Sequence, residues 1–132
     1  MGTKRREEKR KEMKKHHTYF FDIDGTIFKY RKFETYESSD AVLTPGALRK
    51  LQEIYGAGHT IILTTARPED LRDFTVTELL DHGIPWHQLV MGLARGPRHL
   101  VNDMSPTEPG LRAIPWNLER DEGLKNIGVT KV

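Results

Sequence analysis

The sequence predicts one α/β domain built on a mostly parallel sheet. Short apolar runs alternate with amphipathic stretches that start and end at helix-capping residues. An order of strand, helix, strand, helix, strand requires right-handed crossovers, so we expect five strands in three layers. The chain has 132 residues, 36% apolar and 30% charged, which suits one soluble domain over residues 18–132 behind a tail at residues 1–17.

The tail is strongly basic and has no apolar face. Residues 1–17 hold eight Lys or Arg and three Glu, whereas residues 18–132 have a net charge of −3. Met13 is the only large apolar residue in the tail, so we expect a flexible segment, either an exposed helix or disordered chain. Such a basic segment could bind nucleic acid. Residues 18–132 are acidic overall and do not extend the basic surface of the tail. We therefore favour a solvated extension.

The first half of the domain reads as strand, excursion, helix and strand. Residues 18–24 are an apolar and aromatic run that ends in two acids, typical of a strand buried on both faces. Residues 25–43 have no clean period and predict an extended or hairpin-like excursion. Thr44 and Pro45 supply the N-cap and first position of a helix that Gly56 ends. Residues 60–65 predict the second strand.

The second half predicts a further helix and three more strands. Pro68 opens a helix that ends at Gly83, with acidic residues in its first turn. Residues 87–91 and 99–103 predict the third and fourth strands. Residues 111–117 predict a fifth, which Pro115 confines to an edge, and residues 119–127 predict a short helix.

Polar and charged residues collect where three of these strands end. In open parallel sheets, sites form outside the carboxyl ends of the strands. Buried carboxylates are costly without a partner, and Asp22 and Asp103 from neighbouring strands could share one Mg²⁺. Such an ion indicates a phosphorylated substrate, whose oxygens Thr65 and Arg95 could hold. The candidate residues are Asp22, Asp24, Thr65, Arg95, Arg98, Asn102 and Asp103.

Other kinds of site and location are excluded or disfavoured by composition. The chain has no cysteine, which excludes disulfides, thiolate metal sites and cysteine nucleophiles. No apolar run approaches the length of a membrane span, and the N-terminus is too charged for a secretory signal. We therefore expect a cytoplasmic protein with no membrane partner.

The run Asp22-Ile23-Asp24-Gly25-Thr26-Ile27 resembles the signature of the haloacid dehalogenase superfamily of phosphohydrolases. Thr65, a basic residue before the fourth strand and an acid at its end follow in the family's order. The resemblance covers residues 18–127. It implies a Rossmann-like sheet with a flap after the first strand, and the short connections imply that no cap domain is present.

The resemblance also implies a role for each matching residue. Asp22 would be the nucleophile that becomes an aspartyl-phosphate, and Asp24 the general acid and base. Thr65 and Arg95 would bind the phosphoryl group. Mg²⁺ would be held by Asp22, Asp103 and the main-chain carbonyl of Asp24.

Two positions depart from the usual pattern of the family. The basic residue is more often Lys, and here Arg95 and Arg98 both qualify, with Arg95 preferred. The acidic pair is reduced to Asn102 and Asp103, so Asn102 could join the metal. Arg67, two residues beyond Thr65, is interpreted as a brace for the loop.

Three functions remain open at this point. The favoured one is a Mg²⁺-dependent phosphomonoesterase that acts on a small phosphorylated metabolite such as a sugar phosphate. The alternatives are an end-processing phosphatase on polynucleotides, which the basic tail supports, and a non-catalytic interaction module of the same fold. Aromatic residues of the excursion, Tyr30, Phe33 and Tyr36, could form either a pocket wall or the contact of a homo-oligomer.

Overall fold

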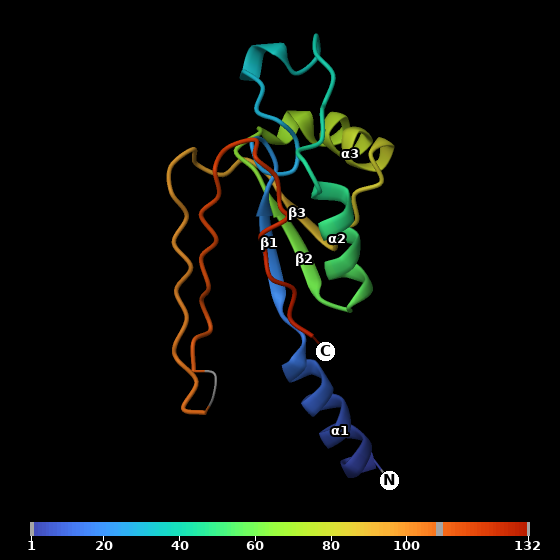
Figure 1. Cartoon of the computed structure of the whole chain (residues 1–132), viewed down its shortest axis with the longest axis vertical. Coiled ribbons are helices and arrows are strands. Elements are labelled where there is room, and N and C mark those ends of the chain that lie inside the picture. Colours follow the sequence, from blue (N-terminus) through green and yellow to red (C-terminus); the bar gives the residue numbers. More distant parts are fainter. Residues whose placement is uncertain (1, 108–109, 132) are drawn as a thin grey trace.

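The sheet has three parallel strands in the order β1-β2-β3 (Figure 1). The computed structural model describes residues 2–107 and 110–131. β1 spans Thr18–Asp22, β2 spans Thr60–Thr64 and β3 spans Gln88–Val90. Because the strands are parallel, their carboxyl ends meet at one edge of the sheet, where the sequence predicts the reactive side chains.

One face of this sheet carries the apolar core. Successive side chains of a strand point to opposite faces, and Phe21, Ile61 and Leu63 point into a core where each is at most 3% exposed. On the other face, Phe20 and Val90 are 52% and 38% exposed. A mixed α/β fold is confirmed, but the three-layer arrangement is not, because the core of the described residues lies against one face.

The helix after the excursion begins two residues later than its sequence signals suggest. α2 spans Ala47–Gly56 and buries Leu51 and Ile54, which lie on one side of the helix. Thr44, the expected N-cap, instead donates its hydroxyl proton to the carbonyl oxygen of Thr26 at 2.6 Å. This bond ties the start of the helix to the loop that follows β1.

Two short elements and a second helix complete the regular structure. A 3-10 turn, η1, spans Phe33–Thr35 within residues 29–43, which we call the flap. A second 3-10 turn, η2 (Glu69–Leu71), leads into α3 (Arg72–Asp81). α3 adds Leu79 to the core that α2 covers.

The C-terminal segment follows β1 on the core side. The helix predicted over residues 119–127 is absent, and turns take its place. Leu124 and Ile127 from these turns are buried in the core. The hydroxyl of Tyr19 in β1 donates a hydrogen bond to the carbonyl oxygen of Gly128 at 3.2 Å. The segment is therefore held along the strand without regular structure.

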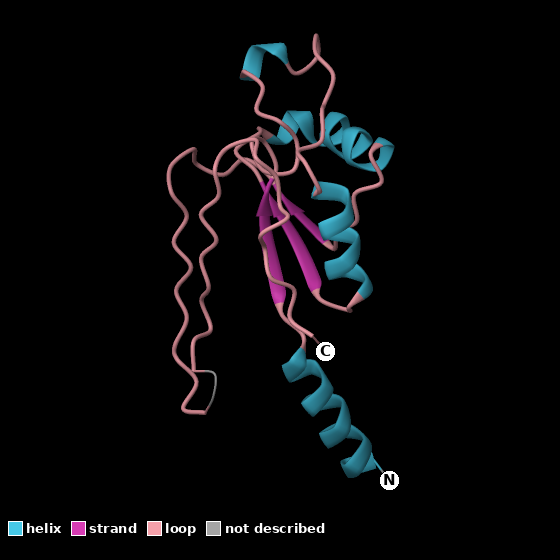
Figure 2. Cartoon of the chain, viewed as in Figure 1, coloured by secondary structure: helices cyan, strands magenta, loops and turns pink. Residues whose placement is uncertain are grey.

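A long excursion, residues 95–107 and 110–118, projects from the body and is called the arm (Figure 2). It contains both remaining predicted strands, residues 99–103 and 111–117, and neither forms a strand in the described structure. Every residue from 99 to 103 is exposed, Val101 by 90%, so the burial that stabilises a central strand is missing. Pro115 also lacks the N–H that a ladder needs. The five-stranded sheet is thus not confirmed.

The basic tail is a helix at the opposite end of the molecule from the carboxyl ends of the strands (Figure 1). α1 spans Gly2–Lys15. Two histidines join it to the body: the main-chain N–H of His17 donates to Nδ1 of the buried His59 at 2.9 Å, and the His16 and His59 rings meet edge to face. Among the described residues, no helix is both long enough and apolar enough to cross a membrane.

Candidate functional site

Asp22 is the last residue of β1, and the loop after it reverses the chain at once. The carbonyl oxygen of Ile23 accepts hydrogen bonds from main-chain N–H groups three to five residues ahead, at 2.9–3.2 Å. Gly25 has a φ of +88°, and a side chain there would meet Cγ of Arg120 at 3.2 Å. This tight loop leaves Asp22 and Asp24 lining the same pocket.

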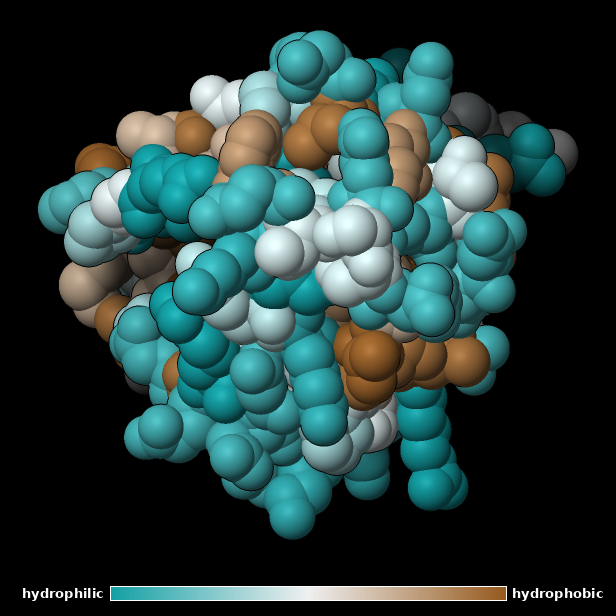
Figure 3. All heavy atoms as spheres, turned by 90° about the horizontal axis from the view of Figure 1, so that it is seen from above, coloured by the Kyte–Doolittle hydropathy of each residue, from teal (hydrophilic) through white to brown (hydrophobic). Residues whose placement is uncertain are grey.

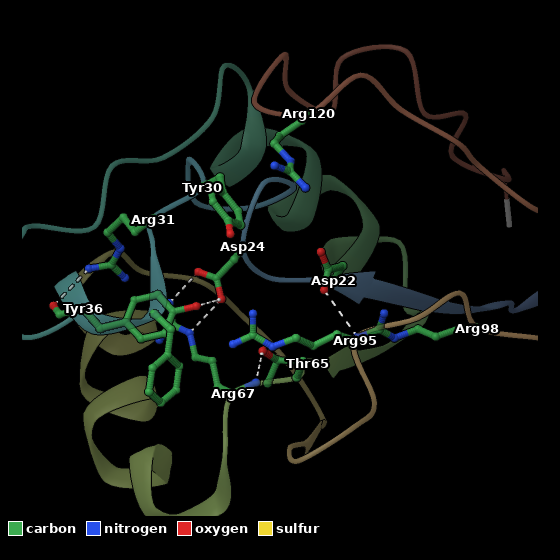
Figure 4. Close-up of a pocket in the computed structure, with 12 residues that line it drawn as sticks. Asp22, Asp24, Tyr30, Arg31, Tyr36, Thr65, Arg67, Arg95, Arg98 and Arg120 are labelled. Carbon is green, nitrogen blue, oxygen red and sulfur yellow. Dashed lines mark hydrogen bonds and ion pairs between the residues drawn. The ribbon is translucent and has the colours of Figure 1, made fainter.

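That pocket has a volume of about 210 Å³ and opens at the carboxyl ends of the strands (Figure 4). Its walls come from β1, the flap, the end of β2, the start of the arm and the C-terminal turns. Five of the predicted site residues meet in it. The lining residues are Asp22, Asp24, Tyr30, Arg31, Phe33, Tyr36, Thr65, Ala66, Arg67, Arg95, Arg98 and Arg120.

Asp24 is held by three hydrogen bonds from two side chains. The guanidinium of Arg67 donates two hydrogen bonds to the carboxylate of Asp24, from Nε to Oδ2 at 2.9 Å and from Nη2 to Oδ1 at 2.8 Å. The Tyr36 hydroxyl donates to Oδ2 at 2.9 Å. A guanidinium fork on a carboxylate is a strong, directional contact, so the orientation of Asp24 is tightly constrained.

Glu78 of α3 links this contact to the flap. Its Oε1 accepts a hydrogen bond from Nη1 of Arg67 at 2.8 Å and another from Nη2 of Arg31 at 2.9 Å. Arg31 belongs to the flap and also donates to the carbonyl oxygen of Ser39 at 3.0 Å. The Arg67 side chain is fully buried. One buried network therefore joins β1, β2, α3 and the flap.

The protonation of this network follows from its contacts. Burial raises the pKa of Tyr36 to about 12, with a further contribution from the charge of Asp24. Burial alone would lower the pKa of Arg67, but hydrogen bonds and charges from Asp24 and Glu78 raise it overall. Tyr36 therefore remains a hydrogen-bond donor, and Arg67 a cation, throughout the neutral range.

Asp22 lacks the set of short hydrogen bonds that holds Asp24. Its side chain is 41% exposed, Thr26 donates a long hydrogen bond to Oδ2 at 3.4 Å, and Arg98 lies 3.7 Å from Oδ1. Burial raises the pKa of Asp22 above its ordinary value of 3.8, although the charge of Arg98 opposes this rise. A carboxylate that is reachable and only partly buried is suited to act as a nucleophile.

Thr65 lies directly after β2 and is buried. Its hydroxyl oxygen accepts a hydrogen bond from the main-chain N–H of Arg67 at 3.1 Å. Its main-chain N–H donates to the carbonyl oxygen of Val90 at 2.9 Å, which continues the pairing with β3. The hydroxyl proton is left to donate into the pocket, as the predicted phosphate contact requires.

Three arginines line the pocket with guanidinium groups that are only loosely held. The guanidinium carbon of Arg95 lies 5.8 Å from the ring centre of Phe33, and that of Arg120 lies 4.2 Å from the ring centre of Tyr30. Arg98 contacts Asp22 at the long distance given above. The aromatic residues of the flap thus form a pocket wall against which Arg95 and Arg120 lie.

Asp103, the predicted third metal ligand, is not among the residues brought together. Its side chain is 78% exposed in the arm and pairs with Arg112 at 3.7 Å. Asn102 is exposed as well, and neither residue lines the pocket. Because the fourth strand does not form, nothing carries these side chains to the end of β1. In residues 2–107 and 110–131, no three metal-ligating side chains form a cluster.

Comparisons with known proteins leave the family of this chain undecided. No protein-family model and no curated protein matches it. Among solved structures, it is similar to the crystal structure of a target protein from Vibrio cholerae, with 18% identity and a TM-score of 0.45. That match covers 66% of this chain and 79% of the other.

Several residues that shape the site were not predicted. Arg67 was interpreted as a brace, and its place two residues after Thr65 is the signal that it reaches the same pocket. Arg31 of the flap carries no local signal, because its contact with Glu78 joins distant parts of the chain. Tyr36 was expected as a possible pocket wall, but its hydrogen bond to Asp24 was not predicted.

Proposed function

We propose that this protein is a Mg²⁺-dependent phosphomonoesterase of the haloacid dehalogenase type that works through an aspartyl-phosphate. The observation that carries this proposal is the contrast between two aspartates of one loop. Asp22 is 41% exposed and loosely held, as a nucleophile requires, while Asp24 is oriented by three hydrogen bonds. The favoured substrate is a small phosphorylated metabolite such as a sugar phosphate.

The charge of the pocket supports an anionic substrate. Five arginines and two aspartates line it. Arg67 is occupied by Asp24 and Glu78, whereas Arg95 has no carboxylate within 4.0 Å among the described residues. Arg95 and the Thr65 hydroxyl can therefore bind phosphate oxygens while the phosphorus faces Asp22.

The proposed reaction has two displacements at phosphorus. A carboxylate oxygen of Asp22 forms a bond to phosphorus while the bond to the substrate's alcohol oxygen breaks, and Asp24 gives that oxygen a proton. Water then attacks the phosphorus, Asp24 accepts a proton from it, and the bond to Asp22 breaks to release inorganic phosphate. The arginines neutralise the charge on the phosphoryl oxygens in both steps.

The contacts of Asp24 leave one position open for proton transfer. Both of its oxygens accept hydrogen bonds in this structure, Oδ2 from Tyr36 and Arg67 and Oδ1 from Arg67. A carboxylate has about four lone-pair positions, so Oδ1 keeps one that can exchange a proton with the leaving group or with water.

The residues of the pocket fit Mg²⁺ with the help of a substrate. Mg²⁺ is commonly held by one or two carboxylates together with substrate phosphates and water. Asp22 offers a carboxylate, and the resemblance assigns the main-chain carbonyl of Asp24 as a second ligand, while Asp103 does not lie in the pocket. When bound, the ion would neutralise charge on the phosphoryl group.

The size and position of the pocket favour a small substrate over a polynucleotide. A volume of about 210 Å³ suits a small phosphate ester. The basic helix α1 leaves from the amino ends of the strands, far from the pocket (Figure 1). A nucleic acid held on α1 would therefore not be led into the site.

Hydrolysis of phosphate esters with and without Mg²⁺ tests the proposal. The unsubstituted chain should release phosphate from an aryl phosphate and from sugar phosphates in the presence of Mg²⁺. Asp22→Asn should abolish this activity, while Asp70→Asn, a change at an exposed aspartate of η2, should leave it intact. Full activity of Asp22→Asn, with deamidation excluded by mass spectrometry, would overturn the proposal.

A further inference from the structure

Arg120 is placed over the pocket by a turn that is itself firmly anchored. The main-chain N–H of Asp121 donates to the carbonyl oxygen of Gly25 at 2.8 Å, and the Asp121 carboxylate accepts a hydrogen bond from the main-chain N–H of Tyr30 at 2.7 Å. Asp121 has a φ of +66°, which is unfavourable for a residue with a side chain. Two hydrogen bonds to distant parts of the same chain thus hold a strained turn against the loop after β1 and against the flap.

The neighbouring residues make room for the Arg120 side chain. Its Cγ would lie 3.2 Å from a Cβ at position 25, so glycine there allows the stem of Arg120 to pass. The guanidinium then rests 4.2 Å above the Tyr30 ring and points into the pocket on the side of Asp22 and Asp24 (Figure 4). Stacking on the Tyr30 ring holds the Arg120 guanidinium in one orientation with little loss of side-chain conformational entropy.

Among the described residues, Arg120 forms no ion pair with a carboxylate. Among the ion pairs of the described residues, Arg31 and Arg67 share Glu78, Arg67 also binds Asp24, and Arg98 approaches Asp22. Arg95 and Arg120 take part in none of them. A phosphoryl group at Asp22 can be bound by Thr65 and Arg95, which leaves Arg120 as a further cation in the same pocket.

We propose that Arg120 is a specificity-determining residue that binds a second anionic group of the substrate. The substrate class is then a small phosphomonoester that also carries a carboxylate or another phosphate. This inference rests on the proposed function, because it assumes that one phosphate of the substrate reacts at Asp22. The pairing of Arg120 with a second anion concerns binding and can be measured without turnover.

The test compares ligands that differ in the second anion alone. Calorimetry on the full chain carrying Asp22→Asn would measure binding of 3-phosphoglycerate and of glycerol 3-phosphate, in which a carboxylate is replaced by a hydroxymethyl group. Glucose 1,6-bisphosphate and glucose 6-phosphate form the second pair, which distinguishes phosphate from carboxylate. The same pairs would be measured after adding Arg120→Gln, Arg120→Lys or, as the control, Arg49→Gln at an exposed position of α2.

We expect the doubly anionic ligand of at least one pair to bind about tenfold or more tightly, the scale of a charge-assisted hydrogen bond. Arg120→Gln should remove that preference, Arg120→Lys should retain part of it, and Arg49→Gln should retain it all. No preference before substitution, or equal weakening of both ligands by Arg120→Gln, would overturn the inference. Absence of hydrolysis by the unsubstituted chain would instead count against the proposed function and leave this binding result standing.

Discussion

The guanidinium of Arg67 binds both carboxylate oxygens of Asp24, at 2.9 Å and 2.8 Å, across a gap of 43 residues in the sequence. The same guanidinium donates to Glu78 of α3 at 2.8 Å and to the Thr75 hydroxyl at 3.0 Å. One buried cation therefore joins the loop after β1 to α3 and to the end of β2. Both the stability of the fold and the geometry of the site should depend on it.

Arg67→Ala should destabilise the protein strongly. It would leave the carboxylate of Asp24, 12% exposed, without its cation, while Glu78 would keep Arg31, and breaking a buried ion pair in this way typically costs about 3–5 kcal/mol. Arg67→Lys should be milder in stability but should lower kcat, because a single ammonium cannot reproduce the two-pronged contact. Urea unfolding and steady-state kinetics would measure these effects, with Arg49→Ala as control. Unchanged stability in Arg67→Ala would show that the network is not structurally important.

Tyr36→Phe should remove one donor to Asp24 and cost about 1 kcal/mol. The pKa of Tyr36 is raised to about 12 from 10.0, so the stability linked to its proton is complete below about pH 10 and is lost as the pH rises toward 12. A titration followed by the absorbance of tyrosinate should therefore show one tyrosine that ionises at a higher pH than the others. Tyr36→Phe should abolish that step. Tyr55→Phe, at an exposed position of α2, should keep it. If the Tyr36→Phe variant still showed the ionisation step at high pH, that step would belong to another residue.

Asp22→Asn should stabilise the metal-free protein at neutral pH. Because burial raises the pKa of Asp22 above 3.8, the folded state loses stability as the pH rises through that pKa and the side chain ionises. Solvent screens a side chain this exposed, so the gain should stay below about 1 kcal/mol. Thermal unfolding should show a higher Tm for the variant at about pH 7 and equal values at about pH 3. A lower Tm at neutral pH would contradict the raised pKa.

Arg95→Gln should raise KM for phosphate esters more than Arg98→Gln does. Arg95 rests on Phe33 and has no carboxylate in the described ion pairs, whereas the charge of Arg98 is shared with Asp22. Loss of a charge-assisted hydrogen bond to phosphate should cost about tenfold or more in KM. Steady-state kinetics with Mg²⁺ would compare the two variants. The reverse order would identify Arg98 as the phosphate-binding arginine.

Removal of residues 2–15 should leave hydrolysis of a small phosphate ester unchanged, because α1 leaves the body at the end opposite to the pocket (Figure 1). The face seen from above is mostly hydrophilic (Figure 3). Removal of residues 2–17 should lower the Tm, because it also takes away the hydrogen bond that the main-chain N–H of His17 donates to His59 and the hydrogen bond between His17 and Thr130. Turnover on 3′-phosphorylated oligonucleotides that depends on α1 and collapses at high salt would favour the polynucleotide alternative.

The parts of the fold that were predicted from sequence are those with strong local signals. The runs that became β1, β2 and β3 were recognised because they are apolar and lie between helix signals and glycines. Residues 99–103 have the same local pattern, yet every one of them is exposed in the arm. The pattern of a strand does not say whether a neighbouring strand will cover it, so tertiary context decided the outcome.

The candidate site was predictable where it follows strand ends and unpredictable where it depends on contacts between distant segments. Asp22, Asp24 and Thr65 lie at the carboxyl ends of β1 and β2, as expected. Arg120 reaches the pocket because Asp121 binds Gly25, nearly a hundred residues earlier in the chain, and no spacing encodes this. The metal role predicted for Asp103 failed to gain support because it required the fourth strand.

The central claim is that Asp22 becomes covalently phosphorylated, and trapping that intermediate tests it most directly. The protein would be mixed with Mg²⁺ and excess aryl phosphate, quenched in acid and reduced with borohydride, which converts an aspartyl-phosphate to homoserine. Peptide mass spectrometry should find homoserine at position 22, none at Asp24 and none in the Asp22→Asn variant. Steady turnover with no modification at position 22, or with the modification at another carboxylate, would contradict the account.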